Sequence, residues 1–437
     1  MLHASASAAR AAAGAASAPA TTAAAAAPRR PIVASKRAGP APPAASAAPA
    51  SAPPQPVFGG GGGGAAPATR PGQARSCADR VRLGRSDLLA SAITLGTMTW
   101  GKQNTEAEAH EQLSYAIDER GLNALDTAEI YPVPPAAETK FLTDKYIGSW
   151  LKKRGKRDDL LIFTKVAGYG DRTAWVRDPP ETTMLDRRQI VSSVDASLAR
   201  LGVDTIDLLQ AHWPQRYVGG LFGAPSYDIA LERPDDGGVS FEETLRGFEE
   251  VVKAGKVRYI GVSNETSYGV ASYARLADEH GLPRIQTIQN VYSLLQRGGF
   301  ETDLAEMCRR ADVSLLAYSP LAGGSLSNKY ATSTAEELRG ARFNLFEGYM
   351  KRYNDSLARE AVAEYARVAR EAGITPAALA LGWVRSRWFV ASNIIGATSM
   401  AQLKENLDAY DAPPLGDDVI AAIGAVYKKY RDPPTSP

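Results

Sequence analysis

The amino-acid sequence predicts an α/β protein, built as a (β/α)₈ barrel behind a long low-complexity leader. Short β-like runs alternate with longer amphipathic patterns along the body of the chain, and eight of each is typical of such a barrel. A doubly wound open sheet is the competing fold, but no predicted strand is followed by the G-x-G-x-x-G turn of a dinucleotide site. The glycine tract at 59–64 follows no strand, so we interpret it as linker.

The elements of this barrel can be placed along the chain in order. The eight predicted strands cover 92–96, 122–126, 160–165, 206–212, 257–263, 285–289, 314–318 and 393–396. The eight predicted helices cover 105–119, 138–153, 187–200, 241–254, 266–279, 302–311, 356–372 and 400–409. A hairpin at 81–89 should close the end opposite the ligand-binding mouth, and a last helix at 417–430 should pack outside. The long connections 213–240 and 319–355 contain aromatic residues, and we expect both to cover the mouth.

The first 78 residues differ in composition from the rest of the chain. They contain no Asp or Glu, seven Lys or Arg, and long Ala, Ser and Pro runs. Such a segment is typical of an organellar transit peptide, whereas a secretory signal would carry a strongly hydrophobic core. A plain low-complexity tail is the alternative. Length and proline content favour the chloroplast over the mitochondrion, and we divide the chain into a leader at 1–78 and a barrel domain at 79–437.

Composition excludes several classes of function. Without the seven positive charges of the leader, the net charge of +2 becomes about −5 on residues 79–437, which does not indicate a nucleic-acid-binding surface. The only cysteines are Cys77 and Cys308, too few for a disulfide framework or a cysteine-based metal cluster. No apolar run reaches the roughly 18 residues of a membrane-spanning helix. We therefore expect no metal, no nucleic-acid partner and no membrane partner.

Polar side chains follow the predicted strands at their carboxyl ends, where α/β barrels bind ligands. The stretch 121–132, GLNALDTAEIYP, passes from an apolar run to Asp126 and then Tyr131. Later strands end on Lys165, His212, Ser263, Asn264, Gln289 and Tyr318. Taken singly, each has an ordinary explanation, such as a surface Tyr, a Lys lying over apolar surface, or a satisfied interior His. Their recurrence favours one site, because the strand ends form a ring only about 15 Å across.

The groups at this mouth suit proton delivery to a carbonyl oxygen. The sequence has no serine nucleophile elbow, no metal-ligand spacing and no pair of facing carboxylates. The ammonium of Lys165 should lower the pKa of Tyr131 from its usual value of about 10, while Asp126 keeps Lys165 charged. A neutral His212 could hydrogen-bond the carbonyl oxygen. The other half of a carbonyl reduction is hydride transfer from a nicotinamide cofactor.

Several motifs in the right order resemble the aldo-keto reductase family. The resemblance runs from LGTMTWG at 95–101 to GATSMAQLKENL at 396–407, which is essentially the whole body of the chain. LDTAEIYPVP, QAHWPQR, GKVRYIGVSNET, IQNVYSLLQR and LLAYSPLAGG are similar to motifs of the bacterial Tas-type members. The resemblance implies a (β/α)₈ barrel that binds NADPH in extended form without a Rossmann domain.

The resemblance also implies roles for individual residues. The family tetrad is matched by Asp126, Tyr131, Lys165 and His212, with Tyr131 as the general acid. Ser263, Asn264 and Gln289 match the residues that hold the nicotinamide carboxamide, and Tyr318 the residue that stacks on its ring. Further expected cofactor contacts are Asp126, Gly96, Thr97 and Met98; in the pyrophosphate loop Ser319, Pro320, Leu321, Gly323, Ser325 and Lys329, with Arg342 beyond it; and on the adenosine side Thr398, Gln402, Glu405 and Asn406. Expected substrate contacts are Trp100, Tyr131, His212 and Trp213.

Two positions depart from the family pattern. Many members have Gly after the catalytic Tyr, whereas residues 132–135 here read Pro-Val-Pro-Pro, as in the Tas-like group, which should stiffen the loop. Many also grip the 2′-phosphate of NADPH with a basic residue near positions that are Gly396 and Gln402 here. Thr398 and Gln402 could still accept that phosphate, with Lys404 nearby, so NADPH remains the expected cofactor over NADH.

The leading hypothesis is an NADPH-dependent reductase of small aldehydes and ketones, acting as a monomer or weak homo-oligomer. The alternative is a nicotinamide-sensing regulatory subunit resembling the β subunits of potassium channels, which keep the same tetrad. A barrel that binds cofactor without catalysis is a third hypothesis, against which the intact tetrad argues. The mouth, with Met98, Trp100, Trp213 and Tyr292, should be largely apolar and aromatic, which suggests a broad range of aldehydes.

Overall fold

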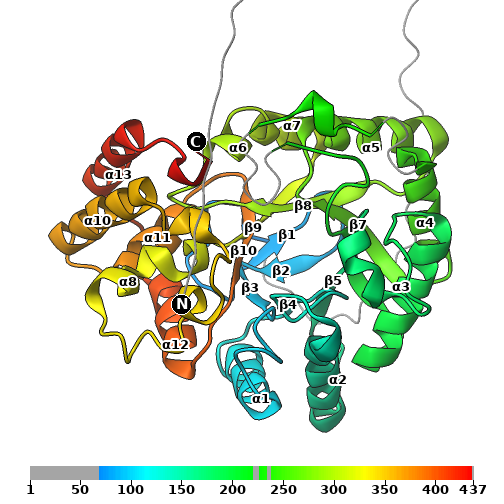
Figure 1. Ribbon diagram of the computed structural model, residues 1–437, viewed down its shortest axis with the longest axis horizontal. Helices are drawn as coiled ribbons and strands as arrows, with labels where there is room; N and C mark the ends of the chain where they lie inside the picture. The colour runs from blue at the N-terminus through cyan, green and yellow to red at the C-terminus, as the bar shows by residue number, and fades with distance from the viewer. Residues whose placement is uncertain (1–67, 220–225, 234–237, 436–437) are drawn as a thin grey trace, which may run out of the picture. The chain divides into compact units, whose positions relative to one another are not determined.

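The computed structural model describes residues 68–219, 226–233 and 238–435, and in them eight parallel strands close into a barrel (Figure 1). Each strand pairs with the next along the chain, and the last pairs back to the first. The strands are β3 Ile93–Gly96, β4 Ala124–Asp126, β5 Leu161–Val166, β6 Ile206–Ala211, β7 Val257–Ser263, β8 Ile285–Val291, β9 Ser314–Tyr318 and β10 Val390–Ile395. The predicted (β/α)₈ barrel is therefore confirmed, with the last strand starting earlier than expected.

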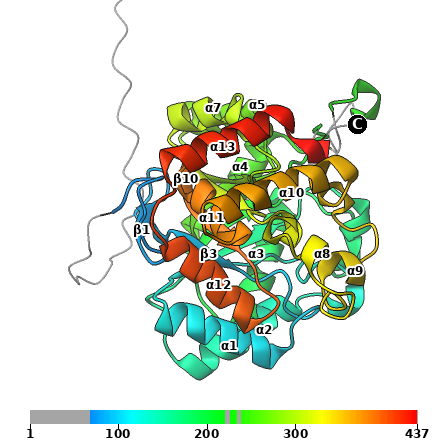
Figure 2. The same cartoon turned by 90° about the vertical axis from the view of Figure 1, so that its left-hand side faces the viewer.

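Helices surround the barrel and cover the outer faces of its strands (Figure 1). The long helices are α1 Glu106–Ser114, α2 Leu142–Arg154, α3 Arg187–Leu201, α4 Phe241–Lys253, α5 Ser267–His280, α7 Leu304–Ala311, α10 Ser356–Glu371, α11 Pro376–Arg385, α12 Met400–Asp411 and α13 Asp417–Lys429. Short turns of helix are α6 Gly298–Glu301, α8 Lys329–Thr332 and α9 Arg342–Leu345, and a π-helical turn, Tyr115–Glu119, follows α1. The one long helix absent from the prediction is α11. The last helix, α13, packs beside α10 on the outside (Figure 2).

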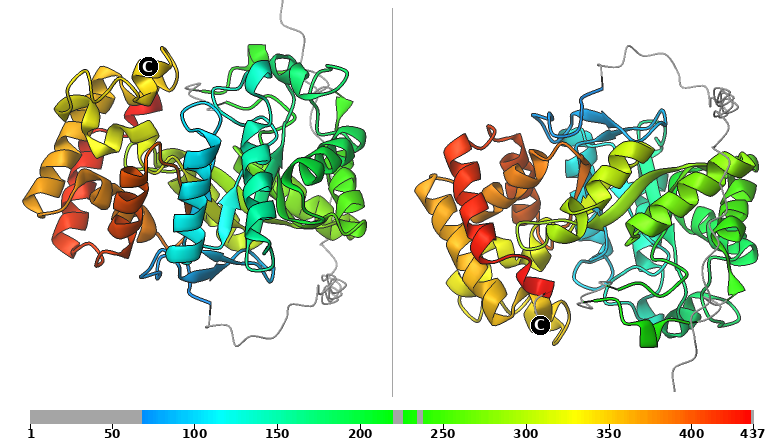
Figure 3. Two further views of the ribbon diagram at one scale, coloured as in Figure 1. Left: turned by 90° about the horizontal axis from the view of Figure 1, so that it is seen from below. Right: turned by 90° about the horizontal axis from the view of Figure 1, so that it is seen from above.

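The expected hairpin closes the amino end of the barrel. Its strands, β1 Arg80–Arg82 and β2 Leu89–Ser91, pair antiparallel and lie at one end of the barrel (Figure 3). The backbone N–H of Gly84 donates to Ser314 Oγ at 2.8 Å, and that of Arg85 donates to Gln286 Oε1 at 2.8 Å. Because both acceptors lie at the starts of β8 and β9, the other end of the barrel is left for the site.

Residues 68–78, which the sequence boundary assigned to the leader, pack against the barrel. The N–H of Thr69 donates to Arg80 O at 2.7 Å, and that of Cys77 donates to Asp411 Oδ1 at 2.6 Å. The Cys77 side chain lies in the same apolar cluster as Val81. The packed domain therefore extends N-terminal to residue 79, while the prediction for 1–67 lies outside the described residues.

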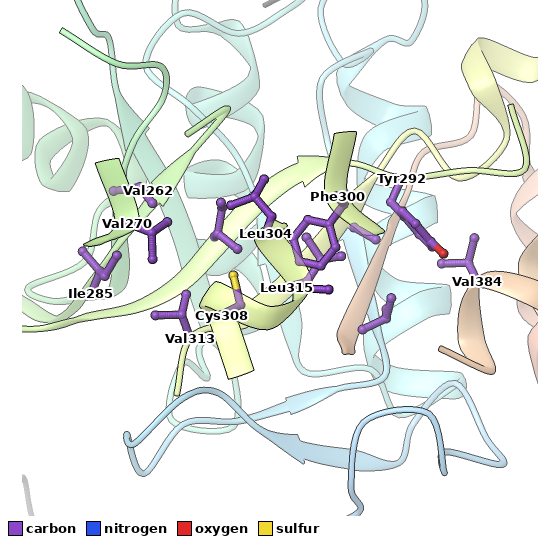
Figure 4. Close-up of a cluster of buried hydrophobic side chains, with 14 of the residues drawn as sticks. Val262, Val270, Ile285, Tyr292, Phe300, Leu304, Cys308, Val313, Leu315 and Val384 are labelled. Atoms are coloured by element: carbon purple, nitrogen blue, oxygen red, sulfur yellow. The ribbon is translucent and has the colours of Figure 1, made fainter. Parts of the chain in front are cut away.

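The outward faces of the strands are apolar and pack on the helices. Figure 4 shows Val262, Ile285 and Leu315 of three adjacent strands near Phe300 and Cys308 of the covering helices. Burial raises the pKa of the Cys308 thiol to about 12, so this cysteine is an unreactive core residue. Within the described residues, no helix is long and apolar enough to cross a membrane.

The inside of the barrel is partly polar just below the carboxyl ends. Thr94 Oγ1 and Ser392 Oγ share a hydrogen bond of 2.7 Å, and both side chains are fully buried. Across the barrel, Gln210 and Thr287 are also fully buried and flank Gly261 on the neighbouring strands. This polar layer lies directly beneath the residues of the candidate site.

Candidate active site

A cavity of about 1120 Å³ opens at the carboxyl ends of the strands. It is walled by strand ends on one side and by the 319–352 connection on the other, so the expectation that this loop covers the mouth is confirmed. Most of the expected site residues line it: Gly96, Thr97, Met98, Asp126, Tyr131, His212, Trp213, Ser263, Asn264, Gln289, Tyr318, Ser319, Pro320, Leu321, Gly323, Lys329, Arg342, Thr398, Gln402, Glu405 and Asn406.

Three of the four tetrad residues form one buried cluster at the floor of the cavity. Asp126 ends β4, and Lys165 lies in the adjacent strand β5. Lys165 Nζ is 2.6 Å from Asp126 Oδ1, 2.8 Å from Thr127 O and 3.4 Å from the Tyr131 hydroxyl. The side chain of Lys165 is completely buried, so the predicted acid beside it is present and the explanation by a surface lysine is wrong.

The direction of these hydrogen bonds decides where the proton of Tyr131 can go. An ammonium has three N–H donors and no acceptor, so the phenol oxygen must accept from Lys165. The Tyr131 O–H is therefore not directed at Lys165 and is available to an acceptor in the cavity. This is the arrangement that a proton donor requires.

Burial dominates the protonation of the cluster. It raises the pKa of Tyr131 well above 10, and the charge of Asp126 acts in the same direction. The expectation that Lys165 lowers the pKa of this phenol is thus wrong for the protein alone, because desolvation of the phenolate outweighs the ammonium. Burial also lowers the pKa of Lys165, which Asp126 opposes. The phenol is consequently protonated at neutral pH.

The fourth member, His212, follows β6 and lines the cavity beside Tyr131. The two rings meet edge to face with centroids 5.8 Å apart. Burial lowers the pKa of His212 well below 6.5, and the charge of Lys165 lowers it further. The imidazole is therefore neutral, as expected from the sequence. Its Nδ1 is buried and has no hydrogen-bond partner in the described part of the chain.

A second network holds the residues expected to meet the nicotinamide. Tyr318 donates its hydroxyl proton to Asn264 Oδ1 at 2.7 Å, while Asn264 Nδ2 donates to His212 O at 2.8 Å. Ser263 Oγ donates to Gln289 O at 2.7 Å. Asn264 adopts φ +56°, a left-handed conformation that Asn tolerates better than most residues. The Tyr318 ring is thereby fixed at the cavity wall.

The loop after β9 forms a cationic cradle. Gly323 and Gly324 have φ +67° and +98°, and a Cβ on Gly324 would approach Lys329 Nζ to 3.2 Å. Lys329 and Arg342 line the cavity. Within the described ranges, neither forms an ion pair with a carboxylate. Burial lowers the pKa of both, and that of Lys329 also falls because of Arg342. Two desolvated cations beside an accessible glycine turn fit an anion such as a phosphate.

Some expected contacts are not at the cavity. Trp100 is fully buried, with its indole N–H donated to Gln112 Oε1 at 3.1 Å, so it cannot touch a substrate. Tyr292 is also buried, where it stacks on Trp383 with centroids 5.2 Å apart. Ser325 donates its hydroxyl proton to Tyr353 O at 2.8 Å and shapes the loop from behind. Lys404 lies over the Tyr115 ring rather than at the cavity.

The second long connection contributes less than expected. Among the described residues of 213–240, only Trp213 lines the cavity. Its indole N–H donates to Tyr169 O at 2.9 Å, and the Arg233 guanidinium lies 3.3 Å from the centre of the Tyr169 ring. The described residues of this connection therefore support Tyr169, which does line the cavity.

The sequence analysis missed part of the substrate side. The cavity is also lined by Ile130, Val133, Pro135, Tyr169, Asp171, Arg172, Thr173, Tyr349, Met350 and Arg352. The expectation of a largely apolar mouth is thus only partly met, since charged groups accompany the aromatic ones. Tyr349 could have been suspected from its place in a long aromatic loop, but its proximity to Tyr131 depends on the path of that loop.

Glu129, another polar residue after β4, turns out to be structural. Its carboxylate accepts from both ends of the Arg177 guanidinium at 2.8 and 3.1 Å and from the N–H of Ala167 at 2.6 Å. Ser193 Oγ donates to the same carboxylate at 2.6 Å. Glu129 therefore ties the loops after β4 and β5 together, which keeps Tyr131 in place. In the described residues, no group of His, Cys, Asp and Glu could hold a metal ion.

A buried acid–lysine–tyrosine cluster at the mouth of a (β/α)₈ barrel defines a class of oxidoreductases. The family model described as "Aldo/keto reductase family" matches residues 92–428, and the chain belongs to this family. It is 46% identical over 352 residues to "Protein tas" of Escherichia coli, covering 80% of this chain and 98% of that protein. It is 37% identical over 282 residues to an "Aldo-keto reductase" of Babesia bovis, covering 63% of this chain and 98% of that protein. It is also 30% identical over 338 residues to a "Probable voltage-gated potassium channel subunit beta" of Arabidopsis thaliana, covering 76% and 91% respectively.

The buried neutral imidazole of His212 should make stability depend on pH. Because the pKa of His212 is lowered in the fold, the unfolded chain binds a proton below about pH 6.5 that the folded chain resists. The free energy of unfolding should therefore fall by about 1.4 kcal/mol for each pH unit below that value through this group. In His212→Gln, stability should fall less between pH 7.0 and pH 5.5 than it does in the wild type. Thermal melts at these two pH values measure the difference.

The exposed His280 provides the matched control for this measurement. Its side chain is 39% accessible, so His280→Gln should keep the pH dependence of the wild type. Identical pH dependence in wild type and His212→Gln would contradict a neutral His212.

Proposed function

We propose that this protein is an NADPH-dependent reductase of small aldehydes and ketones. The observation that carries the proposal is the hydrogen bond from Lys165 Nζ to the Tyr131 hydroxyl, which leaves the phenol proton available to the cavity. Family membership supports it, because the family consists of oxidoreductases.

The cavity fits an extended dinucleotide. The anchored Tyr318 ring offers a flat apolar face at the end nearest Tyr131, and the Gly323–Gly324 turn with Lys329 and Arg342 offers a site for phosphates. Thr398, Gln402 and Asn406 add polar groups at the far end. We infer that these residues hold NADPH in that order, from nicotinamide to adenosine.

When bound, NADPH supplies the hydride for the carbonyl carbon. Tyr131 gives its proton to the carbonyl oxygen, and the phenolate that remains is stabilised by the ammonium of Lys165. Neutral His212 places a ring N–H toward the same oxygen and orients the carbonyl. Asp126 keeps the ammonium charged and fixed, and burial of the cluster excludes water from the reacting groups.

Tyr131→Phe should abolish the reaction while leaving cofactor binding in place. The change removes the proton that is transferred to the carbonyl oxygen but keeps the aromatic ring. We expect kcat to fall by about 10² or more. The assay measures NADPH oxidation with a panel of aldehydes and ketones. The Kd for NADPH, measured by fluorescence titration, should change little.

The control is Tyr268→Phe, because that hydroxyl lies on a side chain that is 66% exposed. If neither the wild type nor Tyr131→Phe turns over any substrate while both bind NADPH tightly, a second function is favoured. The resemblance to a potassium-channel β subunit of Arabidopsis would then point to a cofactor-sensing subunit.

Arg342→Met should weaken the binding of NADPH through its phosphate groups. The variant keeps an unbranched apolar stem but removes a desolvated cation without a carboxylate partner in the described chain. We expect the Kd for NADPH to rise about tenfold or more, and the rise to be smaller for NADH if Arg342 meets the 2′-phosphate.

Arg339→Met is the matched control, because Arg339 lies three positions earlier and its side chain is 78% exposed. An unchanged Kd for NADPH in Arg342→Met would exclude this residue from the cofactor site.

We also propose that the leader is a transit peptide directing the chain to the chloroplast, with the mitochondrion as the alternative. Its lack of acidic residues supports import by either organelle. A fluorescent protein fused behind residues 1–78 should accumulate in plastids of plant cells. Diffuse cytosolic fluorescence would contradict targeting, and mitochondrial fluorescence would decide for the alternative.

A further inference from the structure

We propose that Gln210, which pairs in register with Lys165, is a positioning residue that favours one orientation of the Gln289 amide toward the cavity. The inference rests on the proposed function, because it concerns how the carboxamide of a nicotinamide is recognised. Gln210 itself does not line the cavity.

Gln289 Nε2 lies between two acceptors inside the barrel. It donates to Asp126 Oδ2 at 2.8 Å and to Gln210 Oε1 at 3.3 Å. Gln289 is 3% exposed and Gln210 is fully buried, so water does not compete for these bonds. An amide nitrogen has two hydrogens, and here each has one acceptor.

These two acceptors define the orientation of the amide. A reversed Gln289 amide would place its Oε1 against the Asp126 carboxylate, which cannot donate, and against Gln210 Oε1 unless the Gln210 amide turned as well. Such buried unpaired acceptors are costly. With the nitrogen held inward, Gln289 Oε1 is the atom left for the cavity, where it can accept from the N–H₂ of a carboxamide. Gln210 thus favours the orientation that recognises this group.

The position of Gln210 follows from the register of the strands. On β6 it lies directly between Lys165 of β5 and Gly261 of β7. A Cβ on Gly261 would approach Gln210 Cγ to 3.2 Å and Thr287 Oγ1 to 2.2 Å. Glycine at 261 therefore provides the room in which the long Gln210 side chain reaches Gln289. Gln210 and Gly261 together therefore support the Gln289 nitrogen, which donates to Asp126.

The test compares two nucleotides that differ only at the carboxamide. NADP⁺ carries an amide N–H₂, whereas its 3-acetylpyridine analogue carries a methyl group there and cannot donate to Gln289 Oε1. Dissociation constants for both are measured by calorimetry on the whole protein, so the readout does not depend on turnover. We expect the wild type to bind NADP⁺ about three- to tenfold more tightly than the analogue, the range of one neutral hydrogen bond.

Gln210→Met and Gln210→Asn should lower this ratio toward one, with Asp126 left as the one acceptor that still holds the Gln289 nitrogen inward. The first removes the acceptor, and the second keeps polarity but is one methylene too short to reach Gln289, so one of them serves if the other does not fold. In a Gln289→Leu background, Gln210→Met should change the ratio no further, since its effect acts through Gln289.

Thr94→Val is the matched control, because it breaks the Thr94–Ser392 hydrogen bond in the same buried layer without touching Asp126. It should lower thermal stability but keep the wild-type ratio. A wild-type ratio in folded Gln210 variants, or a ratio of one in the wild type, would overturn the inference while leaving NADPH binding intact. If the wild type binds neither nucleotide, the proposed function fails as well.

Discussion

The buried ion pair between Lys165 and Asp126 is the interaction on which the rest of the site depends. Two charges removed from water cost several kcal/mol each, and their attraction compensates only when hydrogen bonds satisfy the remaining groups. Here Thr127 O accepts from the ammonium, and Gln289 Nε2 donates to the second carboxylate oxygen. The remaining direction of the ammonium is taken by the Tyr131 oxygen. The geometry of the proton donor is thus a consequence of satisfying a buried lysine.

The barrel meets this requirement with polar side chains inside the ring near the carboxyl ends of its strands. The outward faces of its strands carry the apolar residues that pack on helices, while the layer beneath the tetrad carries Thr94, Gln210, Thr287 and Ser392. Polar atoms inside the ring supply partners that an apolar interior would lack. Outside the ring, the buried ion pair between Glu129 and Arg177 holds the loops after β4 and β5 together. Ser193 donates a further hydrogen bond to the Glu129 carboxylate.

The strands and the tetrad could be predicted because their signals are local. Apolar runs that end on a polar residue mark both the strand and its open end, and Asp126, Lys165 and His212 were placed this way. Tyr131 lies in the loop after the strand, and the resemblance to the family assigned its role. The helix α11 was missed because PAALALGWVR is apolar on nearly every side and has no amphipathic stripe, although Thr375 and Pro376 form a good N-terminal cap. Trp100 was misplaced because a sequence does not tell which side of a loop faces the cavity. The pKa of Tyr131 was misjudged because burial, which is a tertiary property, outweighs the neighbouring charge.

Residues 68–78 are part of the packed domain and complete one edge of it. Cys77 and Arg120 share the Asp411 carboxylate, and the strand-like Thr69 extends the edge of the hairpin at Val81. Proteolysis at the compositional boundary would strip the backbone donor from Asp411 and leave an apolar patch of the hairpin open to solvent. Recombinant forms of the domain should therefore retain residues 68–78, because a chain that begins at residue 79 lacks these contacts.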